Sequence, residues 1–490
     1  MPDLDQLTSW HSDWKQLKAL VFGLGVSGFS AADTLAELGA NTLVLAEKAE
    51  ADLLDILDVI GVPHITGEAA KGLPAAVIDF APDVIVVSPG IRPEHELLVW
   101  AREQGIAIWV DIDLAWRLRD KTERLAHWFT ITGTNGKTTT VQLLTAMLNQ
   151  GGIKAEACGN IGKPILDAIR DPDGFDALVV ELSSFQLHYL GQILPFSSAV
   201  LNLADDHLDW HGGFEEYKAA KAKVYENTVA ACVYNVMDKS TESMVEDADV
   251  IDGARAIGFT LGIPGRSQVG FVEDILCDRA FLDDRANNAI EIATLADLSE
   301  IGVLTPHLMA NAAAATAMAR SAGVDPADIR EAIRNFRLDA HRIELVAEAG
   351  GVRWIDDSKA TNPHAADASL ASFERVVWIV GGLLKGVDIS SLVEKHASKL
   401  SAAIVIGKDR SLVLEALAAK APGVSVVEIS ADSGAQVMAQ AVVSAAAIAK
   451  DGDVVLLAPA AASMDQFKDY ADRGNCFASS ARALIGGANG

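Results

Sequence analysis

Cysteine is scarce in this chain, with four residues in 490. They stand far apart, at Cys158, Cys232, Cys277 and Cys476, and no two of them form a C-x-x-C pair. Disulfide frameworks and structural zinc sites need paired or clustered cysteines. The sequence therefore predicts a reduced, cytoplasmic protein without structural zinc.

Positive charge is also in short supply, because 40 Lys and Arg face 67 Asp and Glu and leave a net charge of -27. A broad nucleic-acid or membrane surface needs clustered Lys and Arg. We therefore expect no nucleic-acid partner. Small anionic substrates are compatible with this charge, because a few local cations and magnesium overcome the global field.

Long apolar runs are missing as well. The first twenty residues carry interspersed charge and no apolar signal-peptide core. The Ala-rich stretch Gly302–Ala319 contains Pro306, His307 and Asn311, which favours a helix over a membrane span. We expect no membrane insertion.

Three blocks of strand and helix patterns follow one another, and a length of 490 residues suggests about three domains. Short apolar strands alternate with amphipathic helices, which is typical of a parallel, doubly wound sheet. We predict an α/β protein of three domains, each built on a mainly parallel sheet with flanking helices. The N-terminal domain (1–115) is expected to be Rossmann-like, the central domain (116–338) of the P-loop type and the C-terminal domain (339–490) Rossmann-like.

The strongest chemical signal is the segment Ile131–Thr140, which follows the expected strand HWFTITG and precedes the helical run VQLLTAMLNQ. Its glycines let backbone N–H groups converge on phosphate oxygens, and the helix N-terminus adds partial positive charge. We expect Lys137 to reach the outer phosphates of ATP and the Thr138 hydroxyl to bind magnesium. The usual Walker A spacing would place its first glycine at Ile131, so the alternative is a Gly-rich turn with an incidental lysine. The residues predicted to contact ATP here are Gly133, Thr134, Asn135, Gly136, Lys137, Thr138 and Thr139.

Glu181 ends the next expected strand, DALVV. A carboxylate at a strand tip beside a phosphate loop is a suitable hard ligand for magnesium. Strand-end acids are usually just solvated, which is the alternative. We predict that Glu181 binds the metal.

A second glycine motif, Gly23-Leu24-Gly25-Val26-Ser27-Gly28, follows the strand LKALVF, and Glu47 comes 19 residues after its last glycine. This pattern alone is typical of a dinucleotide site and favours an NAD-dependent oxidoreductase. That class, however, leaves the phosphate loop at 131–140 unexplained.

The compact loop G-T-N-G-K-T-T resembles that of the Mur ligase and folylpolyglutamate synthetase superfamily, and the resemblance covers nearly the whole chain. His207, in the segment Asn202–Asp209, matches the histidine of a family motif N-x-x-x-D-H-x-D that assists a second magnesium. Lys221 matches a family lysine that carbon dioxide converts to a carbamate, an anionic oxygen donor suited to a hard cation. By residue type alone, Lys221 is an ordinary helix-surface lysine, and His211 has no family counterpart. The resemblance implies two magnesium ions with the ligands Thr138, Glu181, His207 and carbamylated Lys221, and a catalytic set of Lys137, His207 and Lys221.

Four segments resemble the D-glutamate-adding branch of the Mur ligase family. The first is the glycine motif at 23–28, which in that branch binds a UDP sugar instead of a dinucleotide. A relative carries Asp at the position of Glu47. The residues implied to bind the UDP substrate are Ser27, Glu47, Ser88 and Asn160.

The other three segments lie further along the chain, at His341–Glu344, Asp356–Pro363, and Gly381–Gly386 with Pro459–Tyr470. They resemble the family motifs H-R-x-E and D-S-K-A-T-N and the loops that hold the side-chain carboxylate of D-glutamate. Leu308 stands where a related H-N-x-x-N pattern has its first Asn. The D-N-P-R motif of the diaminopimelate- and lysine-adding relatives is absent. The implied ATP contacts are Asn311, Arg342, Asp357 and Lys359, and the implied D-glutamate contacts are Thr361, Lys385, Ser463 and Tyr470.

The resemblance implies an ATP-dependent carboxylate–amine ligase. Its expected reaction adds D-glutamate to UDP-N-acetylmuramoyl-L-alanine through an acyl phosphate, in peptidoglycan precursor synthesis. The expected partners are these two substrates and ATP. The alternatives are another Mur-type or folylpolyglutamate-type ligase, an NAD-dependent oxidoreductase and a regulatory P-loop NTPase.

Overall fold

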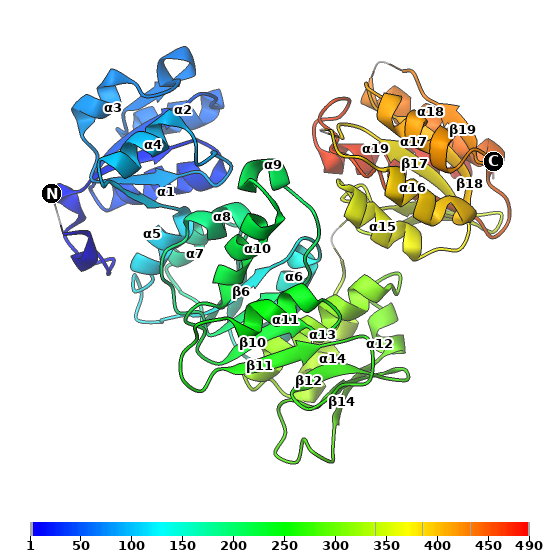
Figure 1. Ribbon diagram of the computed structural model, residues 1–490, viewed down its shortest axis with the longest axis horizontal. Helices are drawn as coiled ribbons and strands as arrows, with labels where there is room; N and C mark the ends of the chain where they lie inside the picture. The colour runs from blue at the N-terminus through cyan, green and yellow to red at the C-terminus, as the bar shows by residue number, and fades with distance from the viewer. Residues whose placement is uncertain (1–2, 339, 385, 432, 489–490) are drawn as a thin grey trace. The chain divides into compact units, whose positions relative to one another are not determined.

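The computed structural model describes residues 3–338, 340–384, 386–431 and 433–488. The chain forms two compact units. The first unit comprises Met1–Thr294 and Ala310–Ile333, and the second comprises Leu295–Met309 and Arg334–Gly490. Figure 1 labels their elements.

The N-terminal part of the first unit is a five-stranded parallel sheet in the order β3-β2-β1-β4-β5. The order reverses between β1 and β4, and open α/β sheets bind ligands at the carboxyl ends of strands at such a point. Its strands are β1 (Lys18–Phe22), β2 (Asn41–Ala46), β3 (His64–Thr66), β4 (Val84–Val87) and β5 (Ala107–Trp109). Its helices are α1 (Val26–Glu37), α2 (Ala51–Val59), α3 (Ala75–Phe80), α4 (Glu96–Glu103) and α5 (Asp111–Arg117), with 3-10 turns η1 (Leu4–Gln6), η2 (Trp14–Gln16) and η3 (Gly67–Ala70).

The rest of the first unit is built on a nine-stranded sheet in the order β14-β13-β12-β11-β10-β9-β6-β8-β7. Strands β12, β13 and β14 pair antiparallel, and the others pair parallel. The strands are β6 (His127–Thr132), β7 (Ala155–Gly159), β8 (Ala177–Glu181), β9 (Ser197–Val200), β10 (Ala231–Asn235), β11 (Arg255–Phe259), β12 (Gln268–Val272), β13 (Ile275–Asp278) and β14 (Ile290–Thr294). The helices are α6 (Lys137–Gln150), α7 (Ile165–Ile169), α8 (Ser184–Tyr189), α9 (Leu208–His211), α10 (Phe214–Ala222), η4 (Lys223–Tyr225), α11 (Lys239–Glu246), and α13 (Pro306–Ser321) and α14 (Pro326–Asn335), which both units share.

The second unit contains a six-stranded sheet in the order β15-β16-β20-β17-β18-β19, parallel except for the β15–β16 hairpin. That hairpin turns at Gly350 and Gly351, whose φ angles of 59° and 72° suit the residue without a Cβ. The strands are β15 (Glu344–Ala349), β16 (Val352–Asp356), β17 (Val376–Gly381), β18 (Leu400–Ile406), β19 (Ser425–Glu428) and β20 (Val454–Leu457). The helices are α12 (Leu295–Ser299), α15 (Pro363–Ala371), α16 (Ser390–His396), η5 (Ala397–Lys399), α17 (Ser411–Lys420), α18 (Gly434–Ile448) and α19 (Tyr470–Ala488).

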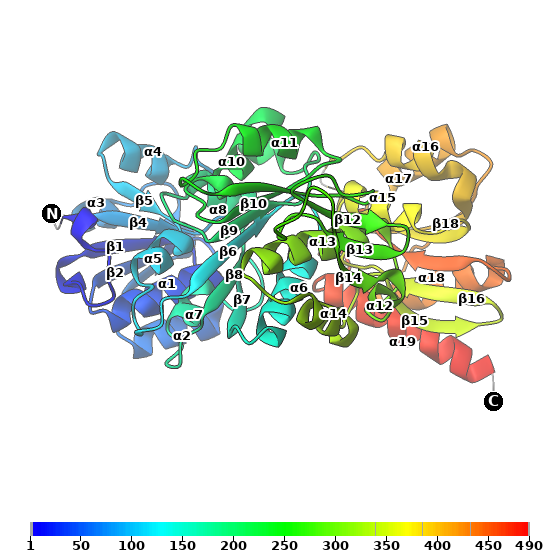
Figure 2. The ribbon, with the colours of Figure 1, turned by 90° about the horizontal axis from the view of Figure 1, so that it is seen from below.

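Strand β17 shows how the second unit buries both faces of its sheet. Val376, Trp378 and Val380 point into one apolar cluster, which contains residues of α15, α16 and α17. Val377 and Ile379 point into the other cluster, with α18 and α19. Figure 2 shows α16 and α17 on the upper side of β18 and α18 on its lower side. A strand covered on both sides needs a continuous apolar run, which RVVWIVGG provides.

The predicted fold class is confirmed, because each of the three sheets is mainly parallel and flanked by helices. Two details differ from expectation. Helix α6 begins at Lys137, four residues before the expected helical run, because the phosphate-loop residues themselves form its first turn. The antiparallel strands β12–β14 were not expected. The predicted domain bounds stay a prediction.

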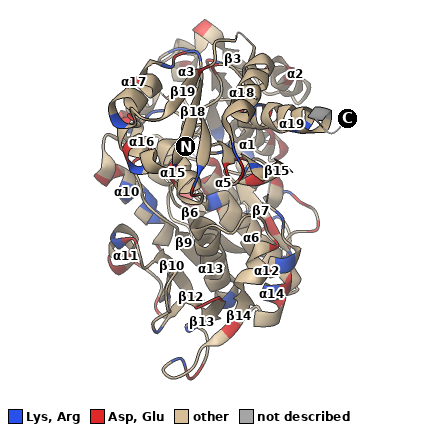
Figure 3. Ribbon diagram, turned by 90° about the vertical axis from the view of Figure 1, so that its right-hand side faces the viewer, with Lys and Arg blue, Asp and Glu red and all other residues tan. Residues whose placement is uncertain are grey.

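Charged residues are spread along the chain. In Figure 3, Lys and Arg positions are interspersed with Asp and Glu positions along the helices and loops. Among the described residues, no helix is both long and apolar enough to cross a membrane.

Candidate functional site

The phosphate loop joins β6 to α6 and depends on two glycines. Gly133 and Gly136 have φ angles of 153° and 83°, values that favour a residue without a Cβ. A Cβ on Gly136 would also lie 2.3 Å from Oδ1 of Asn311. The structure therefore brings Asn311, predicted to contact adenine, against this loop.

Side chains from outside the loop fix its shape. The Asn202 amide accepts a hydrogen bond from the Asn135 backbone N–H at 2.9 Å and donates to the Asn135 carbonyl at 3.0 Å. The Thr134 hydroxyl lies 2.9 Å from the Tyr217 hydroxyl and accepts from the Ala204 N–H at 3.0 Å. These contacts fix the backbone conformation of the loop. The sequence analysis gave Asn202 no role beyond its place at the start of the motif N-x-x-x-D-H-x-D, and it did not single out Tyr217.

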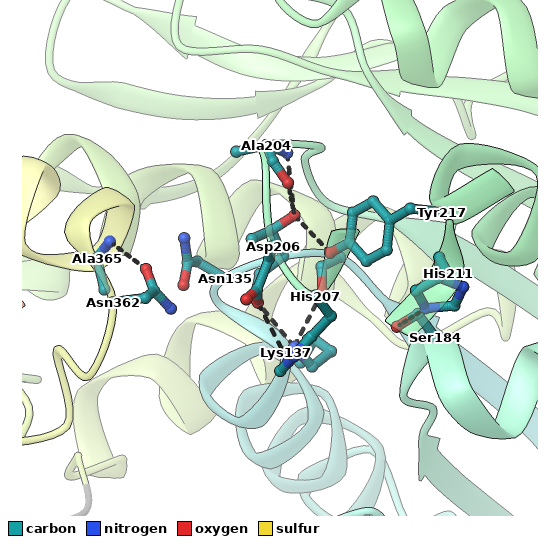
Figure 4. A network of polar contacts seen from close by, with 12 residues as sticks. Asn135, Lys137, Ser184, Ala204, Asp206, His207, His211, Tyr217, Asn362 and Ala365 are labelled. Atoms are coloured by element: carbon teal, nitrogen blue, oxygen red, sulfur yellow. Dashed lines mark hydrogen bonds and ion pairs between the residues drawn. The ribbon is translucent and has the colours of Figure 1, made fainter. Parts of the chain in front are cut away.

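The side chain of Lys137 folds back onto the phosphate loop. Its Nζ donates to the carbonyls of Gly133 at 2.9 Å and Thr134 at 3.0 Å. Figure 4 shows its amine beside Asp206 and His207. A half-buried ammonium at this place is suited to phosphate oxygens.

The predicted metal ligands Thr138 and Glu181 lie in direct contact. The Thr138 hydroxyl donates to Glu181 Oε2 at 2.8 Å, and the Asn160 amide donates to Oε1 at 3.0 Å. Glu181 is buried at the end of β8. Asn160, predicted to bind the UDP substrate, thus lies beside the predicted metal ligands.

His207 precedes the short helix α9 in a left-handed conformation, with a φ of 54°. Its Nε2 lies 3.5 Å from Asp206 Oδ2, and its ring centroid lies 4.7 Å from that of Phe185. His211 instead turns toward Ser184, with Nε2 2.9 Å from the hydroxyl (Figure 4). Burial lowers the pKa of His211 to about 4, so its ring is neutral near pH 7.

Lys221 is buried and not on the surface of α10, with only 2% of its area exposed. Its Nζ donates to the Gly133 carbonyl at 3.0 Å and contacts the Thr132 hydroxyl at 3.2 Å. Burial, and then the nearby charge of Lys137, lower the pKa of Lys221 well below its ordinary value. The reading of Lys221 as an ordinary surface lysine is therefore wrong.

Of the predicted UDP-substrate residues, Ser27 lies in the first turn of α1, which follows β1, and Ser88 comes directly after β4. The Ser88 hydroxyl is buried and has no hydrogen-bond partner among the described residues. It would lie 2.5 Å from a Cβ on Gly23, so this close approach requires the glycine. Burial raises the pKa of Asp111, and the nearby side chains of Gln186 and Ser27 oppose this shift. An unpartnered buried hydroxyl beside a glycine loop fits a polar ligand.

Glu47, the third residue of this set, is exposed at the end of β2. Its Oε1 lies 3.9 Å from Nε2 of His95. It keeps the position expected from the sequence, at the carboxyl edge of the same sheet.

An aromatic cluster that sequence reasoning missed ties the loop after β4 to α8 and α9. The Trp210 indole donates to the Gly90 carbonyl at 3.3 Å, and the Tyr189 hydroxyl donates to the Ile91 carbonyl at 2.9 Å. Arg92 pairs with Asp209 at 2.6 Å. The loop that begins with Ser88 is thereby held by the segment that carries His207.

In the second unit, the structure brings the side chains of Lys359 and Tyr470 together. The Lys359 Nζ lies 3.9 Å from the centroid of the Tyr470 ring. Burial raises the pKa of Asp357 to about 6, and the nearby charge of Arg342 opposes this shift. The Asp357 carboxylate accepts from the Ser369 hydroxyl.

The other described residues predicted to bind D-glutamate are Thr361, in the loop after β16, and Ser463, in the loop after β20. The Thr361 backbone N–H donates to the Lys359 carbonyl at 2.8 Å, and the next residue, Asn362, caps α15 through the Ala365 N–H at 2.8 Å (Figure 4). Ser463 is buried, and its carbonyl accepts from the Phe467 N–H at 2.9 Å. Lys385 lies outside the described residues.

Comparison with family models gives three matches along the chain. Residues 17–110 match the Mur ligase MurD-like N-terminal domain, residues 131–319 the Mur ligase middle domain, and residues 341–461 the Mur ligase, glutamate ligase domain.

Curated relatives and solved structures agree with these matches. A UDP-N-acetylmuramoylalanine–D-glutamate ligase of Leifsonia xyli subsp. xyli is 56% identical over 99% of this chain and 96% of the relative. The ligase of the same name from Streptomyces avermitilis is 48% identical over 96% of this chain and 99% of its own. Among solved structures, the UDP-N-acetylmuramate-alanine ligase MurC of Thermotoga maritima has the same fold, with a TM-score of 0.56 at 17% identity over 96% of this chain and all of the other. This chain belongs to the Mur ligase family, in its branch of UDP-N-acetylmuramoylalanine–D-glutamate ligases.

Proposed function

We propose that this protein forms an amide bond between the amine of D-glutamate and the carboxylate of UDP-N-acetylmuramoyl-L-alanine, with hydrolysis of ATP, in peptidoglycan precursor synthesis. The observation that carries the proposal is the 56% identity to a ligase of this name over 99% of the chain. The phosphate loop that Asn202 and Tyr217 hold in shape supports the ATP-dependent part. A dinucleotide oxidoreductase would give that loop no role.

The reaction needs an activated carboxylate, because a free carboxylate is a poor electrophile. Transfer of the γ-phosphoryl group of ATP to the substrate carboxylate releases ADP and gives an acyl phosphate. The D-glutamate amine attacks the acyl carbon, and the tetrahedral intermediate expels phosphate and leaves the amide. Catalysis here rests on positioning and on neutralising two anions that must approach each other.

Lys137 and the N-terminus of α6 are the protein groups proposed to neutralise the negative charge of the phosphate oxygens. The amine of Lys137 already lies over loop carbonyls, where it is placed to meet phosphate oxygens. Arg342, Asp357 and Lys359 are proposed to contact the same nucleotide, and Thr361, Ser463, Tyr470 and Lys385 to contact D-glutamate. Ser27, Glu47, Ser88 and Asn160 are proposed to bind the UDP substrate.

The donor set of the first unit fits magnesium. The Thr138 hydroxyl donates to the Glu181 carboxylate, so two hard oxygen donors lie in contact here. When bound, magnesium would supply positive charge to the phosphate oxygens. We propose Thr138 and Glu181 as its protein ligands and His207 as a ligand of the second magnesium.

Lys221 fits this set only after modification, because an ammonium repels a cation. A buried amine with a lowered pKa is in part neutral, and a neutral amine adds to carbon dioxide with loss of one proton to give a carbamate. We propose that the Lys221 carbamate holds the second magnesium.

The test is amino-acid-dependent phosphate release, with UDP-N-acetylmuramoyl-L-alanine and MgATP held in excess. D-Glutamate should support turnover, whereas L-glutamate, D-glutamine and D-alanine should not. A site built to pair the distal carboxylate is left with unpaired polar groups when that carboxylate is missing. Phosphate release without any amino acid would instead indicate a regulatory NTPase, and efficient use of L-glutamate would remove the D-glutamate assignment. The absence of nucleic-acid binding stays a prediction.

A further inference from the structure

Arg473, on α19, is a fully buried arginine with no exposed area. Its guanidinium reaches two loops at once. Nε donates to the Ser358 hydroxyl at 2.9 Å, one terminal nitrogen donates to the Ser358 carbonyl at 2.9 Å, and the other donates to the Ala461 carbonyl at 3.0 Å. None of the roles proposed above involves this buried arginine.

Within the part of the chain that the structure describes, the charge of Arg473 has no direct counter-ion. Among the described residues, no carboxylate lies within 4.0 Å of its guanidinium; Asp356 and Asp465 act on it only from a distance. Asp356 instead pairs with His341 at 2.7 Å. Burial lowers the pKa of Arg473 to about 10, so it is still cationic near pH 7. Buried charges are usually paired, and this one is solvated by carbonyl and hydroxyl oxygens.

The groups that Arg473 contacts adjoin the predicted amino-acid and nucleotide contacts. Ser358 stands between Asp357 and Lys359, and its hydroxyl donates to the carbonyl of Tyr470 at 2.7 Å. Ala461 comes two residues before Ser463. One planar fork therefore ties the loop after β16, the loop after β20 and the start of α19.

The loop after β17 approaches the same fork. A Cβ on Gly382 would lie 3.3 Å from a terminal nitrogen of Arg473 and 2.4 Å from the Ala462 carbonyl. Gly382 also has a φ of 132°. The glycine therefore lets this third loop close over the guanidinium.

We propose that Arg473 is a positioning residue for the amino-acid substrate, because its guanidinium holds the loops around Ser358 and Ala461 in register next to the proposed D-glutamate contacts Ser463 and Tyr470. The inference rests on the proposed function, since it names the residue that shapes the D-glutamate site. Arg473 acts through Ser358 and Ala461 and does not touch the reacting atoms.

The test compares Arg473→Met and Arg473→Lys with a control on the same helix, Arg482→Met. Arg482 donates to the Val346 carbonyl at 3.1 Å, and 60% of its side chain is exposed. The KM for each substrate is measured with the other two in excess, and thermal melting reports folding. Arg473→Met should raise the KM for D-glutamate at least tenfold and leave the KM for UDP-N-acetylmuramoyl-L-alanine within twofold. Arg473→Lys, which keeps the charge without the fork, should be intermediate, and Arg482→Met should match wild type.

The inference is overturned if Arg473→Met leaves the D-glutamate KM unchanged, or raises all three KM values by the same factor. If Arg473→Met does not fold, Ser358→Ala decides instead, because it removes one acceptor and keeps the buried charge. It should raise the D-glutamate KM several-fold, and no change would overturn the inference. Wild type that fails to use D-glutamate in the same assay contradicts the proposed function itself.

Discussion

Burial changes what a single lysine can do, and Lys221 is the clearest case. An exposed lysine is an ammonium near pH 7, whereas burial beside Lys137 lowers the pKa of Lys221 and favours the neutral amine. Lys218, on the same helix, is only half-buried. The two lysines therefore form a matched pair for mutation.

We expect Lys221→Ala to lower kcat at least a hundredfold, about 3 kcal/mol of transition-state stabilisation, because the proposed carbamate oxygens are lost. Formate or acetate should restore part of the rate by occupying the vacated anion position. Lys218→Ala should keep the wild-type rate and a stability within about 0.5 kcal/mol. Steady-state phosphate release with and without the added anion checks this. Full activity of Lys221→Ala without an anion would exclude the carbamate.

Asp113 gives a pH-dependence of stability with a definite sign. Burial raises the pKa of Asp113 to about 6, although its carboxylate accepts from the backbone N–H groups of Val110 at 2.9 Å and Gly191 at 2.8 Å. Because the folded pKa is above the ordinary value of 3.8, the group contributes stability below about pH 4 that is lost as the pH rises through about 6. Relative to Asp113→Asn, wild type should lose up to about 3 kcal/mol across this window. Melting curves of both proteins from pH 4 to 7.5 test this, and parallel pH profiles would contradict it.

At the scale of elements, the short helix α9 braces the loop that carries Ser88. Helix α9 has four residues, too few to be stable alone, so it depends on packing. Trp210 supplies that packing: its ring lies 4.6 Å from Phe185 and 4.6 Å from His211 between centroids, and its indole N–H holds Gly90.

We expect Trp210→Ala to lower the free energy of unfolding by about 3 kcal/mol, since it empties a buried ring site. It should also raise the KM for the UDP substrate several-fold more than the KM for ATP, because the loop at 88–91 loses its anchor. The control is Arg92→Ala, which removes an ion pair whose side chains are 56% and 76% exposed. Such a pair contributes at most about 1 kcal/mol. Thermal melting and separate substrate titrations check both variants, and an unchanged KM ratio in Trp210→Ala would contradict the brace.

At the scale of the whole molecule, ligand protection separates a ligase from an oxidoreductase. At a hundredfold excess over Kd, MgATP and UDP-N-acetylmuramoyl-L-alanine should each add about 2.7 kcal/mol to the free energy of unfolding. Each ligand should therefore raise Tm. NADH should not, because the glycine motif at 23–28 is proposed to hold a UDP sugar. Lys137→Ala should reduce the MgATP effect and keep the UDP-substrate effect. Protection by NADH alone would favour the oxidoreductase reading.

Local sequence patterns determined the three mainly parallel sheets and the phosphate loop, because strand alternation, turn glycines and motif spacing are short-range properties. The strand DALVVEL and the loop Gly133–Thr139 are both found where their residues predicted. The antiparallel β12–β14 extension was missed, although β12 and β13 pair locally across the short turn at Glu273 and Asp274.

Only the tertiary structure decided which side chains are buried and what they meet. Lys221 donates a hydrogen bond to the Gly133 carbonyl, 88 positions away in sequence. Asn202 bonds to Asn135 over 67 positions, and Arg473 bonds to Ser358 over 115. No motif spacing predicts contacts between residues so far apart in sequence. The burial and the pKa of a side chain depend on the residues that pack around it in the folded chain. The sequence names candidate chemistry by residue type, and the environment that the fold builds around each side chain sets its charge, its partners and its role.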